Sequence, residues 1–563
     1  MAEITAEEKT VNRIMNDDYL IEIPLYQRPY SWNIDHVSEL FGDLHSAMGR
    51  DDDTHYFLGS IIMISRDNGR HHELIDGQQR LTTLTMLLCV ARDLTDDPTD
   101  QEKIHKYVAQ PADKYEGTTE SPRLLVRRRD RNVFNEWVQK RGGTTNVTAD
   151  TAVGQSDSQQ RMAENIELLR DYLKDLTAKQ RDDLVSFIVT RCYLIVATTT
   201  DRESAYRMFS VLNDRGLNLS PTDILKAEVI GKLPKETQQS ATDQWEAYED
   251  ALGRDSFRDL FQIICSIYVK DKIHHALQTA FQKSVLDEMS ADLFLANVLT
   301  PYADAYTELL TSSHLSPSGN QDSTSLIDNS LRHIMRLEDY TVMPPVLAFL
   351  RHFGRHSEGA QRFFADMERL AFGLRILRLG VEARIRRYGK IVTEVESAAA
   401  DKLDSDSLDW ELFRLTDEEK DKIMGVLDGP IGEHTLCKQI LLVLDSHMSD
   451  AGATYDRPNC TLEHVLPKQP SADSEWLTRF PNDTARVKWT QRLGNLVLLS
   501  RRKNSKASNY EFSRKRDQYF KSSSVAPFAL TVDVLQTTEW TEDILSQRQE
   551  RLLGALKTRW RLG

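Results

Sequence analysis

Three short stretches near the C-terminal end decide the fold of this part of the chain: Thr461-Leu-Glu-His-Val-Leu-Pro467, Leu493-Gly-Asn-Leu-Val-Leu-Leu499 and Lys503-Asn-Ser-Lys506. The first two are short apolar runs, which predict two strands that flank a loop. The third leads into a segment rich in lysine and arginine, which predicts a basic helix. A carboxylate, a histidine and two asparagines lie at or beside the ends of these elements.

These side chains suit a metal-dependent hydrolase of phosphodiesters. In a one-metal hairpin nuclease, a histidine at a strand end takes a proton from water, and a divalent cation bound by oxygen ligands stabilises the leaving oxygen. His464 is the candidate base, and Glu463 and Asn504 are candidate ligands for Mg²⁺ or Mn²⁺. Asn495 is expected to hold the loop backbone and orient the histidine. The candidate catalytic residues are His464, Asn495 and Asn504.

Positive charge gathers beside these residues in an acidic protein. Residues 501–521 contain eight lysines and arginines against Glu511 and Asp517, in a chain of net charge -15. A local basic surface suits a polyphosphate substrate, while the acidic remainder limits unspecific binding. Two other basic runs, 123–131 and 375–390, are typical of solvated faces, with contact to a DNA backbone as the alternative. The expected DNA contacts are Arg501, Arg502, Lys503 and Lys506.

Length and composition indicate a soluble multidomain protein. A chain of 563 residues has room for roughly three or four domains. We expect an α+β, predominantly helical protein with domains at 1–232, 233–410 (a helical spacer) and 411–563. It has no run of 18 apolar residues and no secretion signal, which predicts a cytoplasmic protein without a membrane partner. The five cysteines are far apart and are expected to be buried free thiols.

A second candidate site lies in the first hundred residues. Strands are predicted at 56–64 and 72–75, joined by a turn near 67–69, and a helix is predicted at 81–94. A strand, a glycine turn and a helix start make an anion-binding corner. The Arg80 guanidinium can donate two parallel hydrogen bonds to a phosphate, and the hydroxyls of Thr82 and Thr83 can add further bonds to it. Arg215 is expected to add a charge. The alternative is that Asp76 and Gly77 only form the turn and cap the helix.

An aromatic loop precedes this corner. Two prolines stiffen the stretch from Tyr26 to Trp32, and clustered aromatics with one arginine can stack on a base or nucleotide. An aromatic lid over the core is the equal alternative. The expected contacts are Tyr26, Gln27, Arg28, Tyr30 and Trp32.

Other segments are assigned by periodicity and capping. Ser220 and Pro221 predict a helix start. Residues 235–450 are expected to be helical almost throughout, and a helical tail at 541–560 is expected to pack on the last domain. Helices are also predicted at 5–20, 36–48, 160–175 and 179–187, a buried strand at 193–197 and a mobile loop at 141–158.

Both ends of the chain resemble one family. The stretches Ile23-Pro-Leu-Tyr-Gln-Arg-Pro-Tyr-Ser-Trp32, Ile75-Asp-Gly-Gln-Gln-Arg-Leu-Thr-Thr-Leu84 and Leu212-Asn-Asp-Arg-Gly-Leu217 resemble the N-terminal domain of GmrSD-type restriction proteins. That domain is similar to the ParB/sulfiredoxin-like nucleotide-binding fold. The C-terminal pattern resembles the HNH nuclease domain of the same proteins, a ββα-metal fold, with asparagine at the third motif position.

The resemblance implies a type IV, modification-dependent restriction endonuclease that defends a bacterium against phage. Its N-terminal domain would bind and hydrolyse an NTP (GTP, UTP, CTP or ATP) and sense modified DNA, and its HNH domain would nick or cut it. His464 becomes the general base, Glu463 and Asn504 metal ligands, and Asn495 the supporting asparagine. The cofactor residues implied or expected are Asp76, Gly77, Gln78, Gln79, Arg80, Thr82, Thr83 and Arg215.

Several alternatives stay open. The expected partner is double-stranded DNA with modified cytosine or a phosphorothioate backbone, and a homodimer is left open. A nucleotide-gated, ParB-like DNA-binding regulator with a degenerate nuclease domain is the main alternative, together with a phosphorothioate-sensing nickase. An RNA-directed nuclease is disfavoured, because no RNA-binding module is evident.

Overall fold

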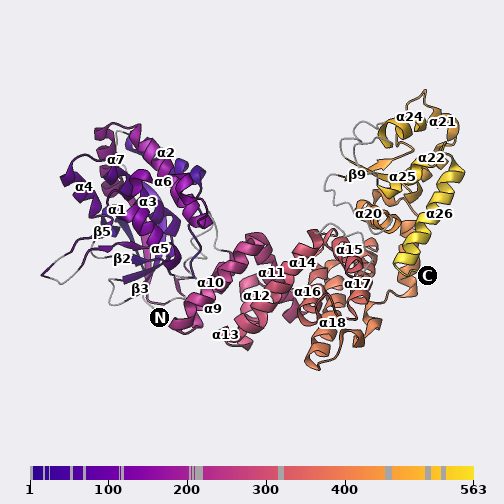
Figure 1. Ribbon diagram of the computed structural model, residues 1–563, viewed down its shortest axis with the longest axis horizontal. Coiled ribbons are helices and arrows are strands. Elements are labelled where there is room, and N and C mark those ends of the chain that lie inside the picture. The colour runs from indigo at the N-terminus through magenta and orange to yellow at the C-terminus, as the bar shows by residue number, and fades with distance from the viewer. Residues whose placement is uncertain are drawn as a thin grey trace. The chain divides into compact units, whose positions relative to one another are not determined.

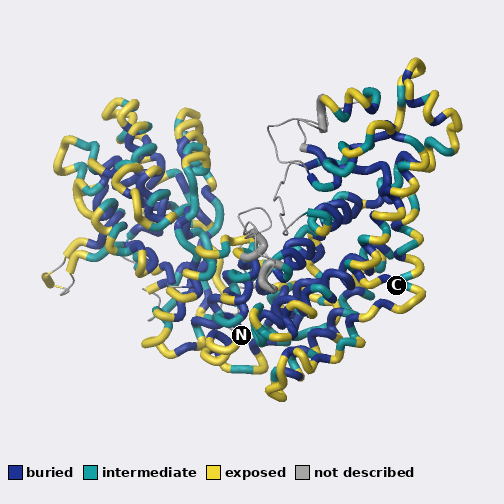
Figure 2. Tube along the Cα trace, turned by 45° about the vertical axis from the view of Figure 1, so that its right-hand side comes forward, coloured by how far each residue is buried: buried dark blue, intermediate teal, exposed yellow. Residues whose placement is uncertain are grey.

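The chain forms two compact units, residues 1–244 and 245–563. Buried residues fill the interior of each unit (Figure 2). Most of the helical region expected at 233–410 belongs to the second unit, because α15 (Ser323–Met335) contacts α20 (Cys437–Met448) there. The computed structural model describes residues 4–16, 19–24, 26–50, 55–66, 71–112, 114–115, 119–201, 204–205, 208, 220–314, 323–449, 460–500, 509–520 and 528–563.

A mixed sheet forms the frame of the first unit. Its strand order is β1-β8-β3-β4-β2-β7. The pairs β1–β8 and β3–β4 are antiparallel, and the pairs β8–β3, β4–β2 and β2–β7 are parallel. The strands are β1 Thr5–Thr10, β2 Leu20–Glu22, β3 Tyr56–Arg66, β4 His71–Asp76, β7 Leu124–Leu125 and β8 Cys192–Thr199, and β5 Ala109–Gln110 pairs separately with β6 Ser121–Pro122.

Helix α3 (Gln78–Asp93) begins directly after β4 and is buried along its length from Leu81 to Arg92. A helix that is buried on every side needs side chains that are apolar or internally bonded all round, and the Thr85 hydroxyl accordingly donates to Leu81 O at 2.8 Å. Helices α6 and α7 pack against it and against α2 (Figure 1). The helices of this part are α1 Val11–Ile14, α2 Ile34–Met48, α4 Pro98–His105, α5 Arg128–Phe134, α6 Asp157–Lys174, α7 Ala178–Arg191, α9 Pro221–Lys232 and α10 Lys235–Leu252. Ser220 caps α9 as predicted.

The start of the chain forms a strand where the sequence predicts a helix; of the predicted range 5–20, the described helical part is α1, Val11–Ile14. Residues Thr5–Thr10 pair antiparallel with β8, with Thr5 opposite Thr198. The hydroxyls of these two threonines lie 2.6 Å apart. The Ala-Glu-Glu-Lys stretch favours a helix locally, but the open edge of β8 supplies backbone partners that a short helix lacks.

Residues 141–158 also differ from the prediction, because this segment is held by named contacts. Two short 3-10 helices, Gly143–Asn146 and Ala149–Ala152, replace the expected mobile loop. The Asp93 carboxylate accepts from Gly142 N and from Thr144 N, both at 3.0 Å. The Gly/Ser/Thr composition predicts a mobile backbone, but the buried carboxylate of Asp93, at the end of α3, holds this segment by hydrogen bonds.

Within its described residues, the second unit is helical except for one pair of strands. Its helices before that pair are as the periodicity predicts: α11 Arg254–Val269, α12 Leu277–Ser284, α13 Ala291–Phe294, α14 Thr300–His314, α15 Ser323–Met335, α16 Met343–Phe353, α17 Ala360–Ile376, α18 Val381–Ala400, α19 Asp417–Leu427 and α20 Cys437–Met448. All five cysteines of the chain are buried free thiols, as expected. Across the described ranges, no helix combines enough length with enough apolar residues to span a bilayer.

The last part of this unit is a strand pair supported by helices. Strand β9 (Cys460–His464) pairs antiparallel with β10 (Leu496–Ser500), as predicted. Tryptophans from different elements, among them Trp476, Trp489 and Trp540, form the core beside these strands. The remaining elements are α21 Glu475–Arg479, α22 Asp483–Thr490, α24 Phe512–Arg514, a π-helix Lys515–Phe520, α25 Ala529–Leu535 and the tail helix α26 Glu542–Arg559.

A buried charge network ties the end of α26 to α17. Glu368 of α17 is fully buried and accepts from Arg559 Nη2 at 2.6 Å and Trp560 Nε1 at 3.0 Å. Its Oε2 lies 3.2 Å from His333 Nδ1. Burial alone would raise the pKa of Glu368, but Arg559 and His333 hold that pKa well below its ordinary value. Burial lowers the pKa of His333.

Replacing Glu368 by glutamine is expected to lower the free energy of unfolding at pH 7 by about 3 kcal/mol, because the half-buried Arg559 loses its fully buried anionic partner. A carboxyl with a lowered pKa stabilises above its unfolded pKa of about 4.5, and this contribution is lost as the pH falls. His333 acts in the same direction, because the unfolded chain takes up its proton below about pH 6.5.

Thermal melts between pH 7 and pH 4 check this prediction. The wild-type midpoint should fall with pH, and the E368Q midpoint should start lower and fall less steeply. Glu358→Gln, at an exposed position close by, is the matched control and should match the wild type. Equal midpoints for wild type and E368Q at pH 7 would show that the network does not hold the tail helix.

Candidate functional site

His464 is the last residue of β9 and pairs in register with Leu496 of β10. Its Nε2 lies 3.1 Å from Gln491 Oε1. Burial lowers the pKa of His464 to about 4, opposed by the Gln491 bond and reinforced by Lys468 and Lys515. The ring is therefore neutral at pH 7, which is the form that accepts a proton. When Gln491 accepts from Nε2–H, Nδ1 is the nitrogen that can act as a base.

Asn495 fixes the chain just beyond His464. Its side chain is fully buried, and its Oδ1 accepts from Leu466 N at 2.7 Å and from Trp540 Nε1 at 3.2 Å. Its Nδ2 donates to Leu466 O at 2.9 Å and to Thr490 O at 3.0 Å. The amide thus uses both of its donors and bonds the main chain two residues after the histidine. The structure places Asn495 in the backbone-holding position that the sequence predicts.

Helix α26 in turn holds the turn that carries Asn495. Gly494 N donates to Gln549 Oε1 at 2.7 Å, and a Cβ on Gly494 would lie 2.6 Å from Leu545 O. Only glycine permits this approach of two main chains. The predicted contact between the tail helix and the last domain is confirmed, and the helix supports the site directly.

Arg548 of α26 bonds the same turn through several main-chain carbonyls. Its Nη1 donates to the carbonyls of Leu493, Gly494 and Leu496 at 3.2, 2.7 and 3.1 Å. Its Nε donates to Asp533 Oδ2 at 2.9 Å. The side chain is 3% exposed, so the guanidinium serves as a buried cap on the turn.

Arg548→Met is expected to lower the free energy of unfolding of the second unit by about 3–5 kcal/mol, because three carbonyls and a carboxylate lose their donor in the interior. Chemical denaturation measures the effect. Arg551→Met is a matched control, since Arg551 binds the same Asp533 oxygen at 2.6 Å but is 54% exposed, and it should cost about 1 kcal/mol or less. Equal effects of the two changes would contradict the assignment.

Glu463 already has a cationic partner. Its Oε1 lies 2.8 Å from Lys515 Nζ, with the two side chains 9% and 0% exposed. Among the described residues, no three His, Cys, Asp or Glu side chains gather closely enough to hold a metal ion.

Several expected site residues lie outside the described residues: Asn504, Arg501, Arg502, Lys503, Lys506 and Arg215. The start of the expected basic helix also lies outside the described residues, and its described part is helical, as α24 followed by a π-helix. Lys515 is buried, and the Arg514 guanidinium lies 3.5 Å from the Tyr510 ring centre. These two cations of the segment expected to face DNA therefore contact groups of the protein itself.

The N-terminal corner has the predicted strand–turn–helix form. Gly77 has φ 92° and N-caps α3 without a side-chain bond, and a Cβ there would meet Ile61 at 2.3 Å. Burial raises the pKa of Asp76, opposed by Arg80 and Arg28 nearby. Arg80 Nη1 donates to Ser60 O at 3.0 Å. One carboxylate and two guanidinium groups thus gather at the start of α3.

The side chains of Gln78 and Gln79 hold the aromatic loop. Gln78 Nε2 donates to Arg28 O at 3.2 Å. Gln79 Oε1 accepts from Ser31 N at 2.7 Å and from Trp32 N at 3.2 Å. The motif that the sequence assigns to a nucleotide thus also fixes the loop expected to contact the base.

The loop itself is largely internal. Tyr26, Gln27 and Tyr30 are buried, which is what the aromatic-lid alternative requires. The Tyr30 hydroxyl lies 2.8 Å from Thr83 Oγ1, so the Thr83 hydroxyl faces the loop. Of the five expected contacts, Arg28 and Trp32 are the partly exposed ones.

The run 123–131 is only in part the expected solvated face: Arg128 and Arg129 are exposed, but Arg123 and Arg127 are buried. Arg123 Nε donates to Lys106 O at 2.6 Å. Arg127 pairs with Asp130 at 3.0 Å, and both side chains are 6% exposed or less. Arg127 and Asp130 line a small pocket with Arg28, Gln78 and Thr82. The sequence analysis did not select Arg127 and Asp130 as a pair, although their i,i+3 spacing at a helix start favours one.

The second basic run, 375–390, is partly neutralised within the unit. Arg375 and Arg384 pair with Asp339 at 3.4 and 3.1 Å, and Arg387 pairs with Glu419 at 2.6 Å. The exposed cations of the run are Arg378, Arg386 and Lys390. Only these three positions keep the solvated character that the sequence predicts.

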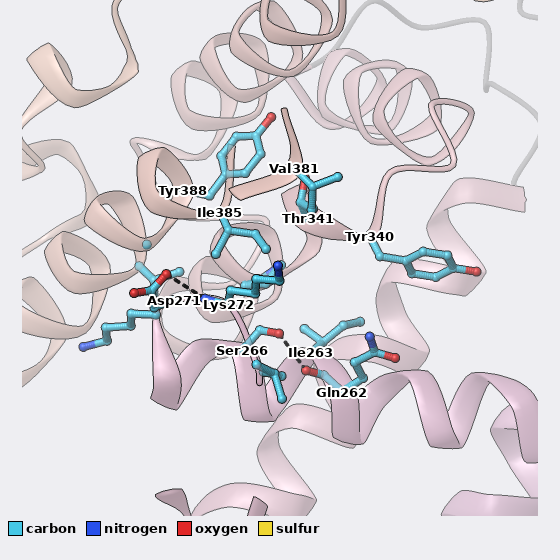
Figure 3. Close-up of a pocket in the computed structure, with 15 residues that line it drawn as sticks. Gln262, Ile263, Ser266, Asp271, Lys272, Tyr340, Thr341, Val381, Ile385 and Tyr388 are labelled. Carbon is cyan, nitrogen blue, oxygen red and sulfur yellow. Dashed lines mark hydrogen bonds between the residues drawn. The ribbon is translucent and has the colours of Figure 1, made fainter. Parts of the chain in front are cut away.

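A cavity of about 230 Å³ lies in the helical region of the second unit, between α11 and α18 (Figure 3). Ser266 Oγ donates to Gln262 O at 2.9 Å across its floor. Its lining includes none of the candidate site residues, although part of it, such as Ile385 and Tyr388, belongs to the basic run 375–390. Its apolar wall includes Ile263, Pro344, Val381 and Ile385.

Comparisons with known proteins agree with this two-ended arrangement. The family model described as the GmrSD restriction endonuclease N-terminal domain matches residues 9–230. The model described as the C-terminal domain of GmrSD restriction endonucleases matches residues 416–555. The first match contains the corner at α3, and the second contains His464, Asn495 and Arg548. No curated protein matches the chain.

Proposed function

The chain belongs to the GmrSD restriction endonuclease family, and from this premise we propose that it couples an NTP-binding N-terminal domain to a DNA-cutting site at His464. Family membership supports a restriction endonuclease that acts on DNA. The observation that carries the assignment of the site is a neutral histidine at a strand end, beside a turn that Asn495 and Arg548 hold rigid.

His464 is the proposed general base. Its pKa of about 4 keeps the ring ready to take a proton from an attacking water throughout the neutral range. The strand pair and the following short helix would correspond to the ββα-metal HNH arrangement. Mg²⁺ or Mn²⁺ is the proposed cofactor, and when bound it would stabilise charge on the leaving oxygen. Asn504 is the proposed ligand.

The corner at Asp76 is the proposed NTP site, on a domain of ParB/sulfiredoxin type. Arg28 and Arg80 suit phosphate oxygens, and the first turn of α3 offers backbone donors. Asp76 would hold the cation that accompanies the nucleotide. Because Gln78 and Gln79 connect this turn to the loop from Tyr26 to Trp32, nucleotide binding and the position of that loop are expected to be coupled.

A cleavage panel tests the proposed function. Purified protein is incubated with phage genomes that carry glucosylated hydroxymethylcytosine, other modified cytosines or phosphorothioate linkages, with each NTP and with Mg²⁺ or Mn²⁺. We expect nicking of a modified-cytosine genome that requires the cation and responds to one NTP. Tight binding without cutting under every condition would instead favour a DNA-binding regulator.

A further inference from the structure

Lys515 lies at the start of the π-helix, yet its side chain is directed entirely at the end of β9. Its exposed fraction is 0%. The Nζ lies 2.8 Å from Glu463 Oε1, 2.8 Å from His464 O and 3.2 Å from Val465 O. An ammonium group has three N–H donors, so all three are engaged by consecutive residues around the histidine.

The carboxylate of Glu463 is in turn engaged in an ion pair with Lys515. A buried ionised group needs a partner, because leaving it unpaired in the interior is strongly unfavourable. Burial raises the pKa of Glu463 and lowers the pKa of Lys515, and each charge opposes that effect on the other. The pair is therefore a self-contained buried unit in which lysine already balances the carboxylate.

The main chain after His464 is held from two directions. Lys515 takes the carbonyls of His464 and Val465, and Val465 N donates to Asn495 O at 3.0 Å. With the Leu466 bonds to the Asn495 side chain, the main-chain groups of three consecutive residues are bonded to fixed partners. The His464 ring remains free of these bonds and has Gln491 as its partner.

Lys515 bonds the histidine end of the strand pair, although β10 leads away from that end. Leu496 is opposite His464, while Ser500, at the end of β10, is opposite Cys460. Lys515 Nζ nevertheless lies 2.8 Å from His464 O.

We propose that Lys515 is a positioning residue for His464, and that Glu463 serves as the counter-ion of Lys515 and not as a metal ligand. This inference rests on the proposed nuclease function for its kinetic part alone. The contacts of the pair make separate predictions for stability and for backbone protection.

The experiment uses the full chain with Lys515→Met, Glu463→Gln and the double change. We expect each single change to lower the thermal midpoint, and the double change to recover most of the loss, because the buried charges are removed together. Hydrogen exchange at residues 460–466 should accelerate in Lys515→Met. The exposed pair Glu418–Lys422, with charges 2.6 Å apart, is the matched control and should show additive changes close to zero.

Kinetics separate positioning from direct contact. Lys515→Met is expected to lower kcat for nicking about 10- to 100-fold, with KM for DNA and its salt dependence unchanged, because the buried lysine does not reach a phosphate. The double change should recover the thermal midpoint but keep kcat low, because methionine does not replace the bonds to the His464 and Val465 carbonyls. The Mn²⁺ concentration for half-maximal nicking should be the same in Glu463→Gln and wild type.

Three outcomes would overturn the inference. A rise in KM with loss of salt dependence would place Lys515 on the DNA. A requirement for much more Mn²⁺ in Glu463→Gln would make Glu463 a metal ligand. Additive losses of thermal midpoint, with unchanged exchange at residues 460–466, would mean that the pair does not hold the strand end. If the wild type cuts no DNA, the proposed function fails, while the stability and exchange results still decide whether the pair holds the strand end.

Discussion

Replacing His464 by alanine is expected to lower the nicking rate about 10²- to 10⁴-fold, which is the usual contribution of a general base, and to leave NTP turnover unchanged. The histidine is half-buried, and its ring has Gln491 as a partner but carries none of the main-chain bonds that hold the strand end. The fold should therefore survive the change. Single-turnover nicking of a supercoiled modified plasmid measures the rate, and thermal melting confirms the fold.

The control for this experiment is another histidine of the same unit. His356 is exposed between α16 and α17, and His356→Ala should nick at the wild-type rate. His464→Gln should be as inactive as His464→Ala, because glutamine fills the space but cannot accept the proton. Full nicking by purified His464→Ala protein would remove the histidine from the chemistry.

Asp76→Ala is expected to lower NTP hydrolysis about 100-fold, equivalent to about 3 kcal/mol of the barrier. The carboxylate lies beside Arg28 and Arg80 at the start of α3, where it is placed to hold the cation of a bound nucleotide. Because this residue ends a strand and precedes a glycine turn, alanine should be accepted without loss of the fold. Steady-state release of phosphate, measured for each NTP, gives the rate.

A charge change elsewhere in the first unit is the control. Asp182 is exposed on α7, and Asp182→Ala should hydrolyse NTP at the wild-type rate. Retained hydrolysis in Asp76→Ala, with hydrolysis lost in His464→Ala, would reverse the proposed roles of the two ends. Nicking by Asp76→Ala with and without NTP then reports how the two activities are linked.

Periodicity and capping predicted the elements whose pattern is local. The strand before Asp76, the buried helix after it and the tail helix carry their own apolar spacing, and Ser220 carries its own cap. The first strand could not be found in this way, because its stability comes from pairing with β8 almost two hundred residues later. A segment of Glu and Lys has a local preference for helix that this pairing overrides.

The site residues likewise differ in whether local sequence or long-range packing determines their role. The position of Asn495 on the second strand predicts that it holds the loop backbone and orients the histidine, and its side chain bonds Leu466 in the structure. Lys515 and Arg548 were not found, because one resembles part of a basic run and the other resembles part of a polar tail helix. Their roles depend on carbonyl groups brought together by the strand pair and α26. The sequence shows that a charged residue is present, but only the folded structure shows whether its side chain lies in solvent or in the interior.

The most direct test of the account uses one phage genome prepared with and without its cytosine modification. Wild-type protein with Mg²⁺ and the preferred NTP should cut the modified DNA and leave the unmodified copy intact, and His464→Ala should cut neither. Equal cutting of both copies by the wild type, or cutting of the modified copy by His464→Ala, would contradict a modification-dependent endonuclease that works through His464.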